Sequence, residues 1–426
     1  MKIIYAIRTS LCLAFAAKLY RVLKFLDFFE EPNSFHDNEC VKIISIGASE
    51  DQTKFNDNSI LMTRWRVVNY LQGENRPGAM YVASGFQTSK KSQSTQDFAA
   101  NDLNIQELPI FNYPENVDFH PHGIDILDST LYVINHAYDR GGERIDVFDI
   151  ITTEESHDGD GIPTHLDYKY SITSDWMKKV LNGALNSLTV VEHNKFYTTQ
   201  YLPEAEDLSN AGWLTVEQKK LVEFLESMFL GSQKTLIWYC EYDAEEKEKE
   251  SRLQCRKVAE NMLGANGITH NQDYSKIFVA DFKSIAVFDR DASTNNLTER
   301  TRVEVPNLVD NLKFDDITGN VYGGTVNSLW SVLKKPFPKE SPELTSGVVE
   351  LSQNKDNGMW EAKEMLSTSK MHCVSNGLRM HNYLVMGAGG FGYEGILVCP
   401  VAMSQSSSKT ETNKPYDDVQ RQPSEL

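Results

Sequence analysis

A two-stranded unit that recurs along the chain constrains the fold more than any other feature of the sequence. Its clearest copy is residues 119–136, FHPHGIDILDSTLYVINH, in which two short apolar runs flank the polar stretch Asp128-Ser129-Thr130. This pattern predicts an antiparallel hairpin. Because an antiparallel return brings the chain back to its starting edge, we expect His122 and His136 on the same rim.

Further stretches repeat the order of polar head, short strand, turn and second strand, beginning at Asn186, Asn266, Asp310 and Asn376. A third apolar run usually follows, as in 143–150, 284–291 and 395–400. Together with the unit that begins near Glu50, the sequence contains six of these repeated units. The repeats predict an all-β fold, a six-bladed β-propeller over residues 40–400, whose inner strands converge on a central axis. The irregular spacing of the heads requires insertions within some blades.

The two ends of the chain differ from this body. Residues 1–29 place Lys2 and Arg8 ahead of an apolar run at 11–17, which indicates a secretory signal peptide. The amphipathic pattern of 19–29 leaves two alternatives open, an uncleaved anchor at a membrane surface or a helix docked on the body. Charged residues interrupt the run and argue against a transmembrane span. Residues 404–426 lack apolar periodicity and are predicted to be disordered.

The polar heads predict a cation site. If the inner strands start on one face, their first residues converge on one funnel: Glu50, His122, Asn186, Asn266, Asp310 with Asn311, and Asn376. Carboxylate and amide oxygens are the ligands that calcium takes. Taken singly, such dipeptides mostly mark turns, so the hypothesis depends on their convergence. The formal net charge of −18 suits cation binding and argues against a nucleic-acid partner.

A family resemblance follows from these motifs. The order Glu50-Asp51, FHPHGI at 119–124, INH at 134–136, LNS at 185–187, GANGI at 264–268 and LVDN at 308–311 resembles the paraoxonase/arylesterase family of calcium-dependent six-bladed propeller hydrolases. The resemblance runs from about Cys40 to Cys399.

The resemblance implies roles for individual residues. A catalytic calcium would be held by Glu50, Asn186, Asn266, Asp310 and Asn311, and the family's histidine dyad would be His122 and His136. A second, structural calcium would be held by Asp51, the backbone carbonyl of Ile124 and the position of Ser187. Ser187 stands where the family has an aspartate, so this second calcium is expected to be weak or absent. The family's histidine is also missing near Gly323-Gly324-Thr325.

Insertions are predicted at 52–78 and at roughly 203–256. In the second, Thr215 and Gln218 form a capping-box pattern before apolar residues at helical spacing, which predicts a helix over 215–230. In the resembled family a helix in this region covers the active site and contacts membrane or lipoprotein. Packing of its apolar face on the propeller is an equally open interpretation.

The cysteines favour a secreted or extracytoplasmic, membrane-associated protein of the secretory pathway. Cys40 and Cys399 begin and end the propeller, where a disulfide, which the family has, would close the ring. Pairing of Cys240 with Cys255 across a charged loop is left open, and Cys12 and Cys373 are predicted to be free. Asn296 begins an N-glycosylation motif.

These features together predict a calcium-dependent hydrolase of lactones or aryl esters. The metal would polarise the carbonyl, and His122, oriented by His136, would take a proton from the attacking water. The plainer interpretation of the dyad is a pair of turn histidines that satisfy backbone groups. Two other functions stay open: a non-catalytic calcium-stabilised scaffold that binds a partner, and a strictosidine-synthase-like propeller without a metal, against which Glu50 and Asp310 argue.

Overall fold

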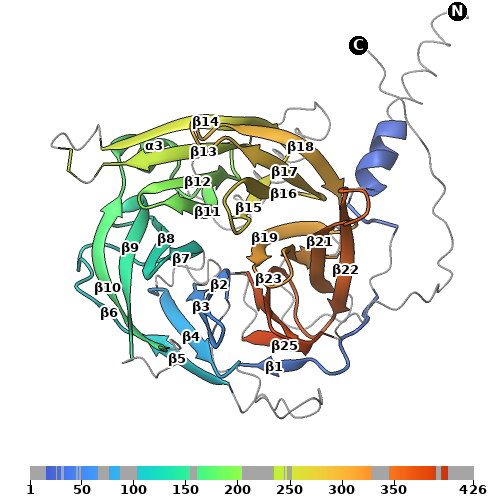
Figure 1. Ribbon diagram of the computed structural model, residues 1–426, viewed down its shortest axis with the longest axis horizontal. Helices are drawn as coiled ribbons and strands as arrows, with labels where there is room; N and C mark the ends of the chain where they lie inside the picture. Colours follow the sequence, from blue (N-terminus) through green and yellow to red (C-terminus); the bar gives the residue numbers. More distant parts are fainter. Residues whose placement is uncertain are drawn as a thin grey trace, which may run out of the picture.

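The computed structural model describes residues 16–24, 26–29, 33–44, 47, 49–65, 76–86, 103–153, 161–203, 235–243, 245–246, 252–327, 345–389 and 395–401. Within these residues, six sheets stand around a central axis, as the view down that axis shows (Figure 1). Helices among the same residues are a segment at 16–24 and α3 (Asp175–Val180). The predicted all-β, six-bladed propeller is confirmed.

Each blade begins at the axis and continues outward through antiparallel neighbours. The inner strands are β2 (Gln52–Asn56), β7 (Pro121–Leu127), β11 (Leu185–Glu192), β15 (Ala265–His270), β19 (Leu308–Asp315) and β23 (Val374–Met380). The second strands are β3 (Ser59–Arg64), β8 (Thr130–Ala137), β12 (Lys195–Gln200), β16 (Lys276–Asp281), β20 (Asn320–Val326) and β24 (Tyr383–Ala388).

The third strands are β4 (Ala79–Ser84), β9 (Gly142–Thr152), β13 (Thr235–Tyr242), β17 (Ser284–Arg290), β21 (Ser346–Gln353) and β25 (Ile396–Pro400). The outer strands are β5 (Asn104–Leu108), β10 (Pro163–Ile172), β14 (Leu253–Met262), β18 (Leu297–Glu304), β22 (Trp360–Thr368) and β1 (Val41–Ile43). The short β6 (Ile110–Phe111) adds to β10 in parallel. The units predicted from the repeats therefore correspond to the inner hairpins of the blades.

The hairpin of 119–136 forms as its sequence predicts. β7 ends at Leu127 and β8 begins at Thr130, which leaves Asp128 and Ser129 as a two-residue turn. Asp128 takes a positive φ of 55°, a conformation that aspartate tolerates better than most residues. Every residue of β8 is buried because neighbouring blades cover both of its faces. Its apolar run is continuous for that reason.

Apolar side chains pack between neighbouring blades. Leu61 and Met80 of the first blade, for example, pack with Ile124 and Val133 of the second, and all four are fully buried. Comparable clusters lie around the ring. Each blade therefore depends on its neighbours for burial, and the ring must close to complete the core.

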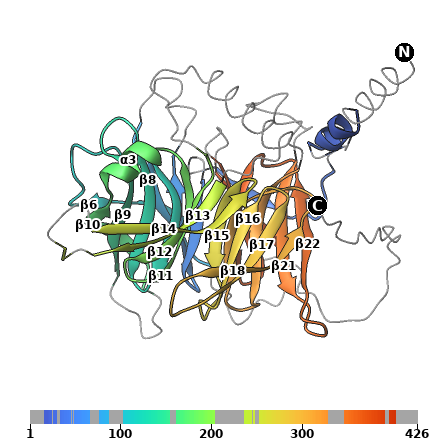
Figure 2. The same cartoon turned by 90° about the horizontal axis from the view of Figure 1, so that it is seen from above.

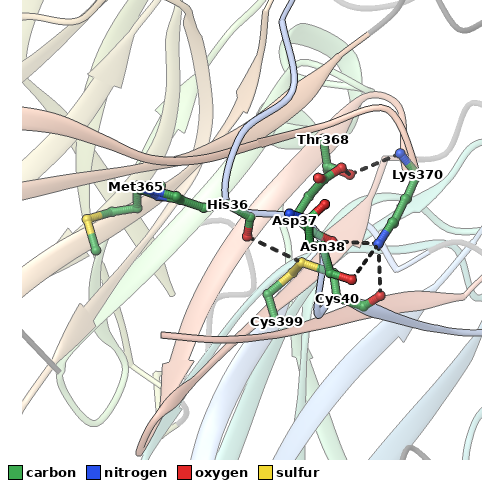
Figure 3. Close-up of a disulfide and its surroundings, with 8 residues drawn as sticks. All are labelled: His36, Asp37, Asn38, Cys40, Met365, Thr368, Lys370 and Cys399. Carbon is green, nitrogen blue, oxygen red and sulfur yellow. Dashed lines mark hydrogen bonds between the residues drawn. A yellow bond between two sulfur atoms is a disulfide. The ribbon is translucent and has the colours of Figure 1, made fainter. Parts of the chain in front are cut away.

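The N-terminal and C-terminal strands close the ring within one blade. β1 pairs with β25 in antiparallel register, and Cys40 and Cys399 form a disulfide beside this pair with Cα atoms 4.2 Å apart. Lys370 Nζ donates to the backbone carbonyls of Asp37 at 2.5 Å and Cys40 at 3.3 Å, next to the disulfide (Figure 3). The predicted Cys40–Cys399 bond is confirmed.

The predicted insertions need correction. Much of 52–78 is not an insertion, because β2 and β3 occupy 52–64 as the first hairpin of a blade. Its polar residues concealed the strand pattern in the sequence. In the second insertion, β13 and β14 belong to the blade, and Cys240 and Cys255 are opposite partners joined by a disulfide. The predicted helix 215–230, the tail 404–426 and Cys12 lie outside the described residues.

The N-terminal helix lies on the same side of the disc as α3 (Figure 2). Val22 and Leu26 are buried, and Asp27 forms a salt bridge with Lys283 in the loop before β17. These contacts join residues 16–29 to the propeller, and the signal-peptide and surface-anchor interpretations stay predictions. No helix in the described part of the chain is long and apolar enough to cross a membrane.

Candidate active site

The polar heads gather at one end of the axis because all six inner strands run in the same direction. Neighbouring inner strands also come unusually close there. A Cβ atom on Gly123 would lie 2.5 Å from the carbonyl oxygen of Asn186, and one on Gly267 would lie 2.5 Å from Cα of Asn311. Glycine is required at both positions, since any side chain would collide with the next blade. These contacts bring the heads of adjacent blades together.

Three asparagine oxygens in this group have no hydrogen-bond partner. They are Oδ1 of Asn186, Asn266 and Asn311, and all are buried. The nitrogen of Asn311 donates to the carbonyl of Glu50 at 3.0 Å, so its amide orientation is fixed. An unsatisfied buried amide oxygen costs about 1–3 kcal/mol, so three together suit the binding of a ligand better than a purely structural network.

Two carboxylates accompany these oxygens. Burial and the negative charge of Glu50 raise the pKa of Asp310 well above its usual range. Two close, partly buried carboxylates repel each other unless a proton or a cation lies between them. Carboxylates and amide oxygens are hard ligands of the kind calcium selects, so the residues present fit a calcium ion. We refer to Glu50, Asn186, Asn266, Asp310 and Asn311 as the upper cluster.

The composition of the upper cluster is unusual for a metal site. Among the described residues, no group of three or more His, Cys, Asp or Glu side chains could hold a metal ion. The case for a cation therefore depends on the neutral amide oxygens beside the two carboxylates.

Asn376, which we expected among the converging heads, has a framework role instead. Its Oδ1 accepts from the backbone N–H of Gly387 at 3.1 Å, and its Nδ2 donates to the carbonyl of Glu50 at 2.9 Å. Ser375 Oγ donates to the same carbonyl at 2.7 Å. The backbone that carries Glu50 is thus fixed by contacts with β23 of the last blade.

The two predicted histidines meet and continue to a third residue. His122 Nδ1 lies 2.8 Å from His136 Nε2, and His136 Nδ1 lies 2.8 Å from Glu143 Oε2. The N–H of Gly183 donates to the same glutamate oxygen at 2.8 Å. Because a carboxylate can only accept, His136 carries a proton on Nδ1. A neutral His136 then accepts from His122, which leaves Nε2 of His122 with a lone pair.

This lone pair faces the upper cluster. Nε2 of His122 is 3.5 Å from Glu50 Oε1 and 3.4 Å from Asn186 Nδ2. Burial opposes a charge on the ring, but the contact and charge of Glu50 outweigh it and raise the pKa of His122. His122 is therefore the residue that links the proton pathway to the candidate cation site.

Sequence reasoning missed Glu143, although a signal was available. Glu143 lies directly opposite His136 in the pairing of β8 with β9. Directly opposed residues of an antiparallel pair have their Cβ atoms about 5 Å apart. The short return at 138–141 would have placed the two residues together once β9 had been aligned with β8.

Aromatic rings lie beside the dyad and were also missed. Trp65 stacks on His120 with ring centroids 4.8 Å apart, and its ring is 6.4 Å from that of His136. Tyr138 lies 5.6 Å from His136, and Tyr201 lies 6.5 Å from His122. Trp65 is buried, so its ring packs against the histidines and helps to hold them in place.

The residues predicted for a second calcium come together around a different cation. Asp51 is fully buried, and its Oδ2 accepts from Lys313 Nζ at 2.9 Å and from the N–H of Ile124 at 2.8 Å. Its Oδ1 accepts from the N–H of Gln52 at 2.9 Å. Lys313 Nζ also donates to the carbonyl of Ile124 at 3.2 Å. The surroundings of Asp51 therefore do not fit a second calcium.

The opposite end of the axis holds a cavity of about 480 Å³. The later residues of the inner strands line it, among them Asp125, His270 and Phe314, and none of the upper cluster or the dyad does. Its polar groups are engaged elsewhere, since Asp125 Oδ2 accepts from the N–H of Val190 at 2.7 Å. The candidate chemistry therefore lies at the other mouth.

Two further predictions concern single residues. Among the described cysteines, Cys373 is free, as expected, and burial near Asp310 and Glu50 raises the pKa of its thiol to about 12. It stays protonated and unreactive at neutral pH. Asn296 is exposed and its Oδ1 accepts from Arg256 at 2.7 Å, and its glycosylation stays a prediction.

Comparison with known proteins places the chain in a family. The family model described as Arylesterase matches residues 70–328, a stretch that contains the dyad and four of the five upper-cluster residues, all except Glu50. The chain belongs to the arylesterase family. This membership sets aside the strictosidine-synthase-like alternative.

Individual relatives agree with the family assignment. Serum paraoxonase/lactonase 3 of Oryctolagus cuniculus is 28% identical over 225 residues, covering 51% of this chain and 52% of that protein. Serum paraoxonase/arylesterase 2 of Homo sapiens is 26% identical over 232 residues, with the same coverage. The chain thus spans about half the length of the curated relatives it matches. A solved luciferin-regenerating enzyme covers 86% of this chain and 95% of its own at 11% identity and a TM-score of 0.44, which adds no functional argument.

Proposed function

We propose that this member of the arylesterase family is a calcium-dependent hydrolase of lactones or aryl esters. The observation that carries the proposal is the contact of the His122–His136–Glu143 row with the upper cluster, which His122 makes through Glu50 and Asn186. The upper cluster is also where the buried amide oxygens without partners lie. The upper cluster suits a cation and the row suits a proton, and ester hydrolysis by water needs both. The names of the relatives, a lactonase and an arylesterase, support the substrate class.

The upper cluster would hold the calcium. When bound, the ion would act as a Lewis acid toward the carbonyl oxygen of the substrate and would neutralise Glu50. The protein contributes the five oxygen-bearing side chains of the upper cluster, which come from four blades and meet at one point. Neutralising Glu50 removes the main support for a charged His122, so the ring stays available as a base.

The histidine row would move the proton. Nε2 of His122 accepts a proton from the attacking water, and the ring becomes positively charged. His136 and the buried carboxylate of Glu143 stabilise that charge and keep the ring oriented. The same nitrogen then returns the proton to the departing alkoxide or phenoxide, which restores the neutral ring. Glu143 is thus a positioning residue, while His122 contacts the reacting atoms.

A substrate panel with and without a chelator tests the proposal. Lactones of several ring sizes and phenyl esters should be hydrolysed in calcium, lose turnover after chelation and regain it when calcium is returned. Magnesium serves as the comparison ion, because its small octahedral shell suits a cluster of this kind poorly. Turnover that is unchanged in chelator would contradict the calcium role.

Replacing the base separates catalysis from binding. His122→Gln should lower turnover by roughly 10²-fold, the usual range for losing a general base, while calcium content is retained. His193→Gln is the matched control, because His193 is exposed and lies at the far end of the β11–β12 hairpin near Asp128. Unchanged turnover in His122→Gln would leave both histidines with a structural role only.

We also propose secretion and contact with a lipid surface through the N-terminal segment. The relatives are named as serum proteins, and the segment exposes Tyr20 and Phe29, each 58% accessible, beside the docked helix. Exposed aromatic rings favour the interfacial layer of a membrane. Flotation with neutral lipid vesicles should recover the protein, and a Tyr20→Ser/Phe29→Ser variant should remain in the soluble fraction.

A further inference from the structure

A lysine, Lys313, is buried at the centre of the ring. Lys313 lies on the inner strand β19, and its side chain is only 9% exposed. Its ammonium joins Asp51, which precedes β2, to the carbonyl of Ile124 on β7. Three blades that are not all sequence neighbours are thus connected by one cation, one residue layer below the upper cluster.

We propose that the Lys313 ammonium permanently takes the place of a second metal ion, so that this chain binds one calcium and holds the centre of its propeller with a buried salt bridge. The inference rests on the proposed function only for the single calcium of the upper cluster. The salt bridge itself is independent of catalysis.

Hydrogen-bond satisfaction distinguishes the two positions. Both oxygens of Asp51 accept hydrogen bonds, and the Ile124 carbonyl accepts one from the same ammonium. Asp51 has no buried side-chain oxygen without a partner, in contrast to Asn186, Asn266 and Asn311. A divalent ion bound to Asp51 and the Ile124 carbonyl would have to displace the Lys313 ammonium or remain a few ångströms from it. Either arrangement is unfavourable in a site with little water.

The chain supplies the ammonium from the opposite mouth of the axis. Lys313 is among the residues that line the 480 Å³ cavity there, so its stem runs from that cavity toward Asp51. A lysine stem is long and flexible enough to bring a compact charge to a fixed carboxylate. Ser187 is consistent with a lysine in place of a calcium ion. An aspartate at this position would add a negative charge that one ammonium does not balance.

Counting bound calcium in the stripped and reloaded full-length protein tests the inference. Native mass spectrometry or equilibrium dialysis should give one ion per chain. Asp310→Asn should reduce the count to zero. A count of two in the wild type would overturn the Lys313 inference and leave the proposed catalysis standing. A count of zero would contradict the proposed calcium catalysis while agreeing with the Lys313 pairing.

Restoring a metal site provides the positive test. Lys313→Asn combined with Ser187→Asp removes the internal cation and returns a carboxylate, so the count should rise by one and calcium should raise the thermal midpoint. Lys313→Met alone should lower the midpoint by about 5 °C or more, because Asp51 loses the ammonium that pairs with it. Lys54→Met is the matched control, since Lys54 lines the same cavity but pairs with Asp316 at 3.0 Å. Lys54→Met should change neither the number of bound calcium ions nor the thermal midpoint.

The outcomes are separable even if one variant folds poorly. An unchanged midpoint in Lys313→Met, or a folded Lys313→Asn/Ser187→Asp protein that takes up no further calcium, would overturn the inference. The wild-type count alone remains decisive if the double variant does not fold.

Discussion

Two polar positions on the axis of this propeller differ in how completely their hydrogen bonds are satisfied. In the upper cluster, three buried amide oxygens have no partner and one buried carboxyl has a strongly raised pKa. One layer below, the carboxylate of Asp51 accepts three hydrogen bonds, one of them from an ammonium. The comparison teaches that the same ring of strands can present oxygen ligands either to an external ion or to a side chain of its own.

The difference has an energetic consequence. Unsatisfied buried oxygens lower stability by about 1–3 kcal/mol each, and this cost is recovered only when a ligand binds. The satisfied centre contributes to stability whether or not a ligand is present. We therefore expect changes in the upper cluster to affect activity and metal content, and changes at the centre to affect folding.

The largest expected effect is on turnover in the upper cluster. Asp310→Ala should lower ester hydrolysis by roughly 10³-fold and remove bound calcium, because a charged ligand that faces the axis is lost. Initial rates and metal analysis measure the two quantities. Asp316→Ala, on the exposed turn after β19, is the control and should retain both. Full activity in Asp310→Ala would exclude Asp310 from the site and end the comparison.

The next effect concerns the centre. Asp51→Asn and Lys313→Met should each lower the free energy of unfolding by about 3 kcal/mol, since each leaves the other buried group unpaired. The double variant should cost clearly less than the sum, because removing both partners leaves no uncompensated charge. Urea unfolding in the presence of chelator measures all three. Strictly additive losses would show that the pair is not coupled.

A smaller effect is expected in the histidine row. Glu143→Gln should lower turnover by roughly 10- to 100-fold and lower the apparent pKa of the base in the pH–rate profile, because the imidazolium loses its negative partner. Calcium content should not change. Glu364→Gln is the matched control, a half-buried glutamate that accepts from Asn307 at 2.7 Å in a different blade. A loss of turnover without the pKa shift would assign Glu143 a purely structural role.

The smallest effect reverses with calcium. In chelator, Asp310→Asn should raise the free energy of unfolding by roughly 1 kcal/mol, because it removes the repulsion between two partly buried carboxylates. In excess calcium the wild type should be the more stable protein, since it alone keeps the full ligand set. Thermal midpoints under the two conditions measure the crossing, with the exposed Asp289→Asn as control.

The raised pKa of Asp310 gives this prediction a pH dependence. The folded chelated protein holds a proton that the unfolded chain releases near its usual value of about 4. Stability without calcium should therefore fall as the pH rises above about 4, and Asp310→Asn should weaken that slope. A wild-type stability in chelator that rises over this range would contradict the proposed repulsion.

Much of the fold followed from local sequence signals. Turn residues such as Asp128-Ser129, between apolar runs, indicated the inner hairpins, and the number of polar heads gave the number of blades. The first blade was partly misread because the polar strand QTKFN does not show apolar alternation. Such a strand is recognised only once its neighbours supply the packing.

The sequence by itself determined the hairpins, the polar heads, the ring closure at Cys40 and Cys399 and the meeting of His122 with His136, because these follow from strand direction and chain connectivity. Only the tertiary structure decided which oxygens are left without partners, that Glu143 supports the dyad and that Lys313 reaches Asp51. Those features depend on side-chain contacts between strands that pack or pair only in the folded molecule, and β19 and β2 are separated by about 250 residues of chain. Contacts of that kind leave no local pattern to read.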